Sequence, residues 1–308
     1  MPNINKCVIS VLAAALIAAS CGKPAPRPVV ADGRPFTDDL GRTVVVPAEP
    51  RRIVCTSPEI TEILFAVGAG DLVVGVVRGC DWPPATAELP TVGDFSTVSV
   101  ERVVALDPDL IITTGHEQER MIEQLEPLGV PVVAFMAPGI DGVRRNILAV
   151  GGIVGHDEEA AVAAAAFEAE LEKVRSAVAA VPEAERPRVY LEICPEPLMT
   201  VSEGSYVHEA IELAGGVNVG TGLPRPYSRI EPEAVIARNP EVILLCHGAA
   251  AAAVAGRTGW GGVAAVRSGR IYEANPDLVL RAGPRLAKGV ASLHEFFYGD
   301  APGAGGTP

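Results

Sequence analysis

The sequence has few of the residues that build common catalytic and nucleic-acid-binding sites. Lysine and arginine together number 25 against 38 acidic residues, which gives a formal net charge of −13. Binding to nucleic acid needs clustered cations that neutralise phosphates, so this balance argues against such a partner. The chain holds only five histidines, and each His-Glu pair lacks the second histidine of a zinc-protease helix.

Motifs for nucleotide chemistry and for a serine nucleophile are also missing. The sequence contains no P-loop and no GxSxG elbow. The glycines of residues 65–75 follow a predicted helix and do not join a strand to a helix, which makes a dinucleotide site improbable. We therefore expect no enzyme, with no catalytic residue, no cofactor and no resident metal.

Two stretches of the chain are near copies of each other. Residues 101–112 read ERVVALDPDLII, and residues 233–244 read EAVIARNPEVIL. Each copy predicts a short helix stopped by Pro108 or Pro240 and followed by an apolar strand. The repeat predicts two lobes, with Glu101 and Glu233 at matching points at the start of an exposed helical turn. Such a pair suits a partner with two-fold symmetry.

Apolar strands alternate with helical stretches through both halves, as at residues 52–56, 109–114, 188–193 and 241–246. This alternation predicts an α/β protein whose lobes hold mainly parallel sheets with flanking helices. Residues 157–181 are nearly all good helix formers and would extend about 37 Å. We expect this one long, rigid helix to join the lobes. The ends of the strands then line a shared ligand cleft that closes only slightly.

The first 21 residues differ from the rest of the chain. A lysine, the apolar run of residues 8–19, Ser20 and Cys21 resemble a lipoprotein signal peptide that ends at an acylated cysteine. Ordinary cleavage that leaves Cys21 as a thiol is the alternative. We expect the signal at 1–21, a tether at 22–45, an N-terminal lobe at 46–150, a connecting helix at 151–182, a C-terminal lobe at 183–298 and a disordered tail at 299–308.

Four further cysteines stand at the ends of predicted strands. In an oxidising compartment they could form one bridge per lobe, joining Cys55 to Cys80 and Cys194 to Cys246. Four buried free thiols are the alternative, because the sequence does not show whether the spacing allows a bridge.

Several blocks in order resemble one family: CDWPP at 80–84, LPTVGDFSTVSVERVVALDPDLII at 89–112 and RAGPRL at 281–286. Across about residues 46–298 the chain resembles the helical-backbone substrate-binding proteins of ABC importers, which serve corrinoids, ferric siderophores and haem. Within that group it most resembles the cobalamin-binding proteins. The resemblance implies a lipid-anchored receptor at the periplasmic or outer face of a membrane, a monomer that delivers a corrinoid to a dimeric permease with its ATPase subunits.

The resemblance also implies roles for individual residues. Glu101 and Glu233 match the glutamates that dock on the permease, although each could be a solvated residue of a first helical turn. Ligand-binding positions are matched by three aromatics and by two charged residues near residue 280, namely Trp82, Phe95, Tyr227, Asp277 and Arg281. Taken alone, the aromatics are more often packed or turn residues, and Asp277 with Arg281 could be a local ion pair.

His116 and His247 follow strands of the repeated blocks and could face each other across the cleft, where histidine can ligate cobalt or iron. A ferric siderophore or haem receptor of the same fold is one alternative function. A metal-dependent enzyme that uses His116, His247 and the thiols is a second alternative from a different class.

Overall fold

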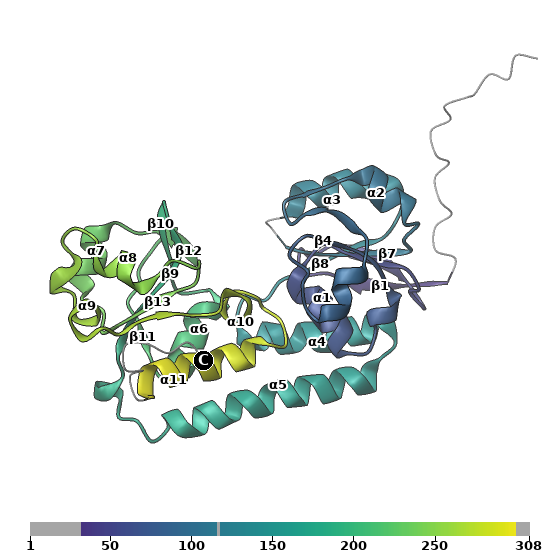
Figure 1. Cartoon of the computed structure of the whole chain (residues 1–308). Coiled ribbons are helices and arrows are strands. Elements are labelled where there is room, and N and C mark those ends of the chain that lie inside the picture. Colours follow the sequence, from purple (N-terminus) through teal and green to yellow (C-terminus); the bar gives the residue numbers. More distant parts are fainter. Residues whose placement is uncertain (1–31, 116–117, 300–308) are drawn as a thin grey trace, which may run out of the picture.

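The computed structural model describes residues 32–115 and 118–299 of the chain. Figure 1 shows an N-terminal lobe and a C-terminal lobe standing beside each other along one long helix, α5 (Asp157–Val178). Each lobe has its own sheet, with helices packed around it. The predicted fold class is confirmed: the protein is a two-lobed α/β structure with one sheet in each lobe.

The sheet of the N-terminal lobe has the strand order β6-β5-β4-β3-β7-β8. Its neighbouring strands are parallel except for the β5–β6 pair. Every residue of β3 and β8 is buried, as expected for parallel strands covered on both faces. The strands are β3 (Ile53–Cys55), β4 (Val73–Val77), β5 (Thr91–Asp94), β6 (Thr97–Val98), β7 (Leu110–Thr114) and β8 (Val132–Phe135).

The sheet of the C-terminal lobe has the order β12-β10-β9-β13-β14, and β11 pairs with the first part of β9. Strands β9, β13 and β14 are parallel, whereas β10 turns back against β9 and β12 against β10. The strands are β9 (Arg188–Pro195), β10 (Leu198–Val201), β11 (Val217–Asn218), β12 (Tyr227–Arg229), β13 (Val242–Leu245) and β14 (Ile271–Glu273).

Local signals explain where the main helices begin and end. Helix α1 starts after Ser57, whose side chain accepts a hydrogen bond from the Ile60 N–H, and Pro58 occupies its first turn. Helix α4 ends at Gly155, which adopts a left-handed backbone with a φ of 78°. The helices besides α5 are α1 (Pro58–Ala66), α2 (Val100–Ala105), α3 (Glu119–Leu125), α4 (Ile140–Val154), α6 (Tyr206–Leu213), α7 (Pro232–Arg238), α8 (Ala251–Ala255), α9 (Ala264–Ser268), α10 (Pro276–Val279) and α11 (Leu286–Tyr298). Short 3-10 turns lie at Gly70–Leu72, Pro84–Glu88, Glu126–Leu128, Glu183–Glu185 and Trp260–Gly262.

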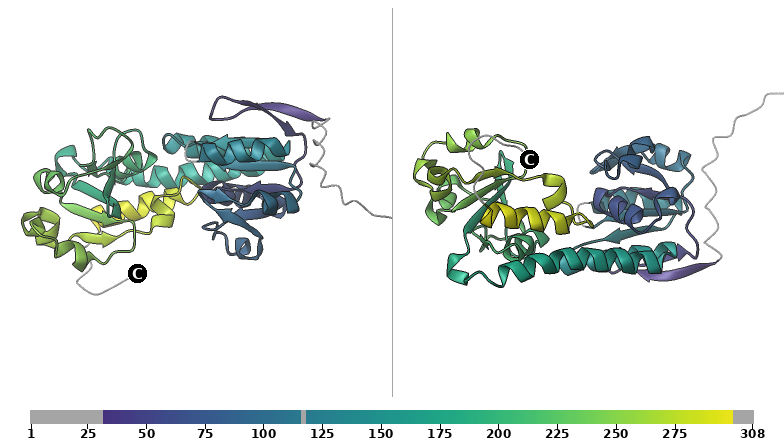
Figure 2. Two further views of the ribbon diagram at one scale, coloured as in Figure 1. Left: turned by 90° about the horizontal axis from the view of Figure 1, so that it is seen from above. Right: turned by 60° about the horizontal axis from the view of Figure 1, so that its bottom comes forward.

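Helix α5 buries one stripe of side chains, which recur at helical spacing from Ala160 to Val178. It packs against α4 of the N-terminal lobe and against α11 of the C-terminal lobe. Figure 2 shows it running along both lobes. The helix therefore connects the two lobes without a break. It ends at Val178, three residues before the predicted end at 181.

The start of the folded body differs from the prediction. Residues expected within the tether form an antiparallel hairpin of β1 (Gly33–Thr37) and β2 (Thr43–Pro47). The turn is organised by Asp38, whose carboxylate accepts hydrogen bonds from the backbone N–H groups of Leu40 and Arg42. The same carboxylate pairs with the Arg42 guanidinium at 2.6 Å. The predicted tether therefore ends earlier than residue 45, because this turn and the β-branched residues of β2 favour a hairpin.

Apolar side chains form one core that extends from the N-terminal lobe through α4, α5 and α11 to the C-terminal sheet, and a second core under α7, α8 and α9. The second core centres on Trp260, which is 1% exposed. Within the described part of the chain, no helix is both long enough and apolar enough to cross a membrane.

Candidate functional site

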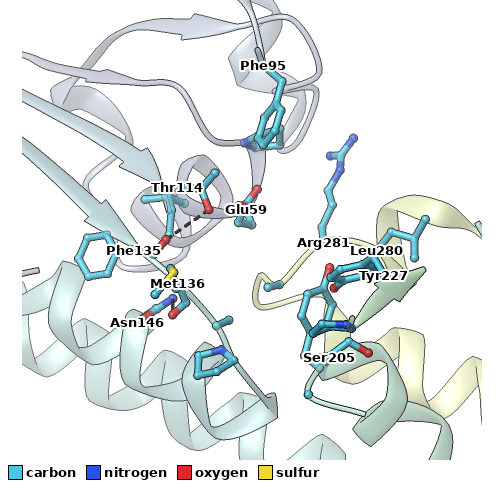
Figure 3. Close-up of a pocket in the computed structure, with 18 of the residues that line it drawn as sticks. Glu59, Phe95, Thr114, Phe135, Met136, Asn146, Ser205, Tyr227, Leu280 and Arg281 are labelled. Atoms are coloured by element: carbon cyan, nitrogen blue, oxygen red, sulfur yellow. Dashed lines mark hydrogen bonds between the residues drawn. The ribbon is translucent and has the colours of Figure 1, made fainter. Parts of the chain in front are cut away.

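A cavity of about 630 Å³ lies between the two lobes. Figure 3 shows its two walls, with Glu59, Phe95 and Thr114 on the N-terminal side and Tyr227 and Arg281 on the C-terminal side. Most of the remaining lining is apolar, from Pro58, Ile60, Phe135, Met136, Ala137, Pro138, Ile193, Pro226, Leu280 and Ala282. Most of these residues lie at the ends of strands or in the loops and helix starts next to them, and parallel sheets bind ligands at the carboxyl ends of their strands. The cavity is therefore the candidate ligand site.

Arg281 is surrounded by carboxylates. Its guanidinium donates to Asp81 at 2.6 and 3.2 Å and lies 2.7 Å from Asp277. A further contact of 3.3 Å reaches Glu62 in α1. Burial acts to lower the pKa of Arg281, but the hydrogen bonds to Asp81 and the charge of Asp277 raise it above its ordinary value. The cation stays charged and is already neutralised by the protein.

Glu59 is the acidic residue of the cavity wall, in the first turn of α1. Burial raises the pKa of its carboxyl above the ordinary value, while hydrogen bonds from its own backbone, Ser57 and Thr114 act against that rise. Arg225, on the opposite wall, has an exposed side chain. The cavity thus has apolar walls with one half-buried acid and one exposed base.

Some of the ligand-binding residues expected from the sequence line the cavity and others do not. Phe95, Tyr227 and Arg281 line the cavity. Trp82 lies beside it, 44% exposed, with the Arg285 guanidinium 4.8 Å from its ring centroid. Asp277 holds Arg281 as an ion pair, the arrangement given above as an alternative. His116 lies outside the described residues.

His247 does not face the cavity. Its Nε2 atom lies 2.8 Å from the Glu192 carboxylate, which also pairs with Arg257 at 2.6 and 2.7 Å. These residues lie next to the second core, where Arg257 covers the Trp260 ring. A histidine pair across the cleft therefore has no support from His247. Within residues 32–115 and 118–299, no group of three His, Cys, Asp or Glu residues is placed to hold a metal ion.

Glu101 and Glu233 are both exposed, in the first turns of α2 and α7. Figure 1 shows these helices on the same side of the molecule, one per lobe and opposite α5. The pKa of Glu101 is lowered by hydrogen bonds from the backbone of Glu101 itself and from the Ser99 hydroxyl, so this carboxylate is charged at neutral pH. The two helices place one acidic side chain on each lobe.

Neither of the two possible disulfides is present among the described residues. Cys55, Cys80, Cys194 and Cys246 are all free thiols. The Cys55 thiol donates to the Ser57 carbonyl at 3.4 Å, and Cys80 accepts from the Thr61 hydroxyl at 3.3 Å. Position at strand ends predicted proximity, but it could not show how the side chains are directed.

Sequence reasoning missed Glu59, Arg225 and Met136 as lining residues. Glu59 could have been found, because it lies in the first turn of the helix that follows β3, and the ends of parallel strands mark the binding edge. Arg225 and Met136 lie in irregular segments, and the sequence has no periodic signal that directs them to the cavity.

Comparison with known proteins agrees with this geometry. The periplasmic binding protein family matches residues 53–278. An uncharacterised ABC transporter substrate-binding lipoprotein, YvrC of Bacillus subtilis, is 30% identical over 310 residues, covering 94% of this chain and 96% of the relative. A vitamin B12-binding protein of Vibrio cholerae is 30% identical over 249 residues, covering 80% of this chain and 88% of the relative.

A solved structure, the periplasmic haem-binding protein RhuT of Roseiflexus in its apo form, has a TM-score of 0.73 at 27% identity. The match covers 80% of this chain and 98% of that one. Because the family pattern spans most of the chain and the relatives match nearly their full lengths, the chain belongs to the periplasmic binding protein family and is a substrate-binding protein of an ABC transporter.

Proposed function

We propose that this protein captures a corrinoid, with cobalamin as its ligand, and delivers it to a dimeric ABC permease. The observation that carries the proposal is the chemistry of the cavity. Its walls are mostly apolar, with Phe95 on one side and Tyr227 on the other. Such walls suit a large macrocycle, because each aromatic ring can remove apolar surface from water. The vitamin B12-binding relative supports the same ligand.

Charge separates a corrinoid from the anionic alternatives. Haem has two carboxylates, and many ferric siderophores are anions, so their sites benefit from free cations. Of the two arginines that line the cavity, Arg281 is already held by Asp81, Asp277 and Glu62, which leaves the exposed Arg225 as the one cation of the described lining outside this cluster. A corrin periphery made of carboxamides needs hydrogen-bond partners and does not need an excess of positive charge.

Haem is the second candidate. Tyr206 and Tyr227 both line the cavity, and a tyrosine oxygen can ligate haem iron. The similarity to a haem-binding protein supports this alternative. Titration with cyanocobalamin, haemin and a ferric siderophore, followed by absorbance and by calorimetry, distinguishes the ligands. Saturable binding of cyanocobalamin alone is expected. Tight binding of haemin without cyanocobalamin binding would replace the corrinoid assignment.

We also propose that Glu101 and Glu233 dock on the permease and that Cys21 carries a lipid anchor. One exposed carboxylate per lobe, on the same side of the molecule, suits a permease with two equivalent subunits. Cys21 lies outside the described residues. The lipobox-like sequence before it and the name of the Bacillus relative, a lipoprotein, support the anchor.

A further inference from the structure

Glu59 is the one acidic residue among the described residues of the cavity wall, and the proposed function has not used it. It lies in the first turn of α1, the helix that follows β3 and contributes to the N-terminal wall. Figure 3 shows its carboxyl near Thr114, on the wall that faces Arg281. Apolar side chains of Pro58, Ile60 and Phe95 line the same wall.

No cation neutralises this carboxyl within the described part of the chain. Its polar contacts are with its own backbone, Ser57 and Thr114. Glu62, one turn later in α1, is a like charge, and the buried thiols of Cys55 and Cys80 also lie near enough for Glu59 to raise their pKa values. None of these titratable neighbours favours an ionised Glu59.

The cations nearest to α1 are directed elsewhere. The segment between α10 and α11 packs against Glu59, since a Cβ on Gly283 would lie 3.3 Å from the Glu59 carbonyl oxygen. Arg281 and Arg285 flank that glycine, and both donate to Glu62. Arg281 additionally pairs with Asp81 and Asp277, so its charge is already shared among other carboxylates.

We propose that Glu59 acts as an uncharged carboxylic acid that recognises a primary carboxamide on the ligand. This inference rests on the proposed function and names a contact within that site. A neutral carboxyl has one O–H donor and one carbonyl acceptor on the same side. A primary carboxamide presents the complementary acceptor and donor, so the two groups form a pair of hydrogen bonds. Burial raises the pKa of Glu59 and so favours the protonated form of the carboxyl.

The pairing has a definite response to substitution. Glu59→Gln keeps one donor and one acceptor in the same place, so it retains cyanocobalamin affinity within about threefold. Glu59→Ala removes both and weakens binding by about tenfold, the scale expected for hydrogen bonds lost in a partly dry site. In the wild type, affinity falls as pH rises through the pKa of Glu59, because ionisation removes the donor. The Glu59→Gln variant shows no such fall.

The experiment measures cyanocobalamin affinity by calorimetry from pH 5 to pH 9 for the full-length wild type, Glu59→Gln and Glu59→Ala. Glu158→Gln is the matched control, since Glu158 also occupies a first helical turn and is exposed on α5, away from the cavity. Circular dichroism and thermal unfolding verify that each variant is folded. A cobalamin derivative with one peripheral carboxamide hydrolysed to a carboxylate supplies a second probe of the same contact.

The outcomes are separable. Saturable wild-type binding, retained in Glu59→Gln and weakened in Glu59→Ala, supports the inference. Wild-type binding that Glu59→Ala leaves unchanged overturns the role of Glu59 and leaves the corrinoid function intact. Loss of affinity in Glu59→Gln as large as in Glu59→Ala also overturns it, because an ionised group would then be required. Absence of corrinoid binding to the wild type overturns the proposed function itself.

Discussion

The buried carboxylate of Glu62, in α1 of the N-terminal lobe, accepts two hydrogen bonds from the Arg285 guanidinium of the C-terminal lobe, at 2.9 and 2.6 Å. The Glu62 side chain is 2% exposed and that of Arg285 is 16% exposed. Arg281 adds a third contact to the same carboxylate. These bonds join the lobes beside the cavity, at a place separate from α5.

Glu62→Gln should therefore destabilise the protein. The substitution leaves the mostly buried Arg285 guanidinium without its charge partner, whereas Arg281 keeps Asp81 and Asp277; breaking a buried pair typically costs about 3 kcal/mol in the free energy of unfolding. Urea denaturation measures the change. Glu49→Gln is the control, because Glu49 and its partner Arg51 are 79% and 77% exposed and such pairs contribute little. Equal stability of the two variants would show that the contacts between the lobes are not stabilising.

Replacing both Glu101 and Glu233 with alanine should impair uptake without changing ligand affinity. Both side chains are exposed and neither lines the cavity. Binding is measured by titration with the purified protein, and uptake is measured with labelled ligand in cells that produce the permease. Glu158→Ala tests whether loss of an exposed charge alone has the same effect. Normal uptake by the double variant would contradict the docking assignment.

The buried thiols should react slowly in the folded protein. Burial raises the pKa of the Cys80 thiol to about 11 and that of Cys246 to about 12, and it raises the pKa of Cys55 as well. Because the thiolate is the reactive form, iodoacetamide at neutral pH should label the less buried Cys194 first. Peptide mass spectrometry gives the order of labelling. A disulfide-linked peptide that contains Cys55 and Cys80 would contradict the free-thiol state.

Glu59 should make stability depend on pH in a known direction. Its pKa is raised in the folded protein above its ordinary value near 4.5, so the native state holds this proton longer than the unfolded chain. The resulting stability is fully present below the unfolded pKa and is lost as pH rises through the folded pKa. Glu59→Gln does not titrate, so its free energy of unfolding relative to wild type should increase from pH 5 to pH 8. Urea denaturation at both values, with Glu158→Gln alongside, tests this; a constant difference would refute it.

Cys21→Ser should release the protein from membranes. Two or more acyl chains hold a protein at a bilayer, whereas the sequence after Cys21 contributes no comparable apolar run. Fractionation of cells that produce either form, followed by immunodetection, measures the distribution. Retention of the serine variant in the membrane fraction to the wild-type extent would exclude the lipid as the anchor.

The repeated helix–strand block and the long run of helix-forming residues at 157–181 were enough to predict the two lobes and the helix that connects them. Both features are local patterns, and each places an element without knowledge of distant residues. The same repeat placed Glu101 and Glu233 at equivalent, exposed helix starts. The family resemblance then directed attention to Phe95, Tyr227 and Arg281, which do line the cavity.

Contacts between distant residues were beyond the sequence pattern. Arg281 and Glu62 lie 219 positions apart, so no spacing rule could show that the Glu62 carboxylate of the other lobe contacts the Arg281 guanidinium. The hairpin of β1 and β2 was not predicted from the sequence, because its turn depends on a hydrogen bond from the Arg42 N–H to the Asp38 carboxylate. The sequence left both bridged and free thiols open, because strand ends define neighbouring positions but not side-chain direction, and the structure has the free thiols.

Helix α5 bears on how far the two lobes can move relative to each other. Since it packs on α4 of one lobe and α11 of the other, a wide separation of the lobes would have to bend it or detach one of its faces. A wide closure of the lobes over a ligand is resisted in the same way, so the cavity keeps nearly the same width before and after capture. The spacing between Glu101 and Glu233, one on each lobe, would accordingly stay nearly constant whether or not a ligand is present.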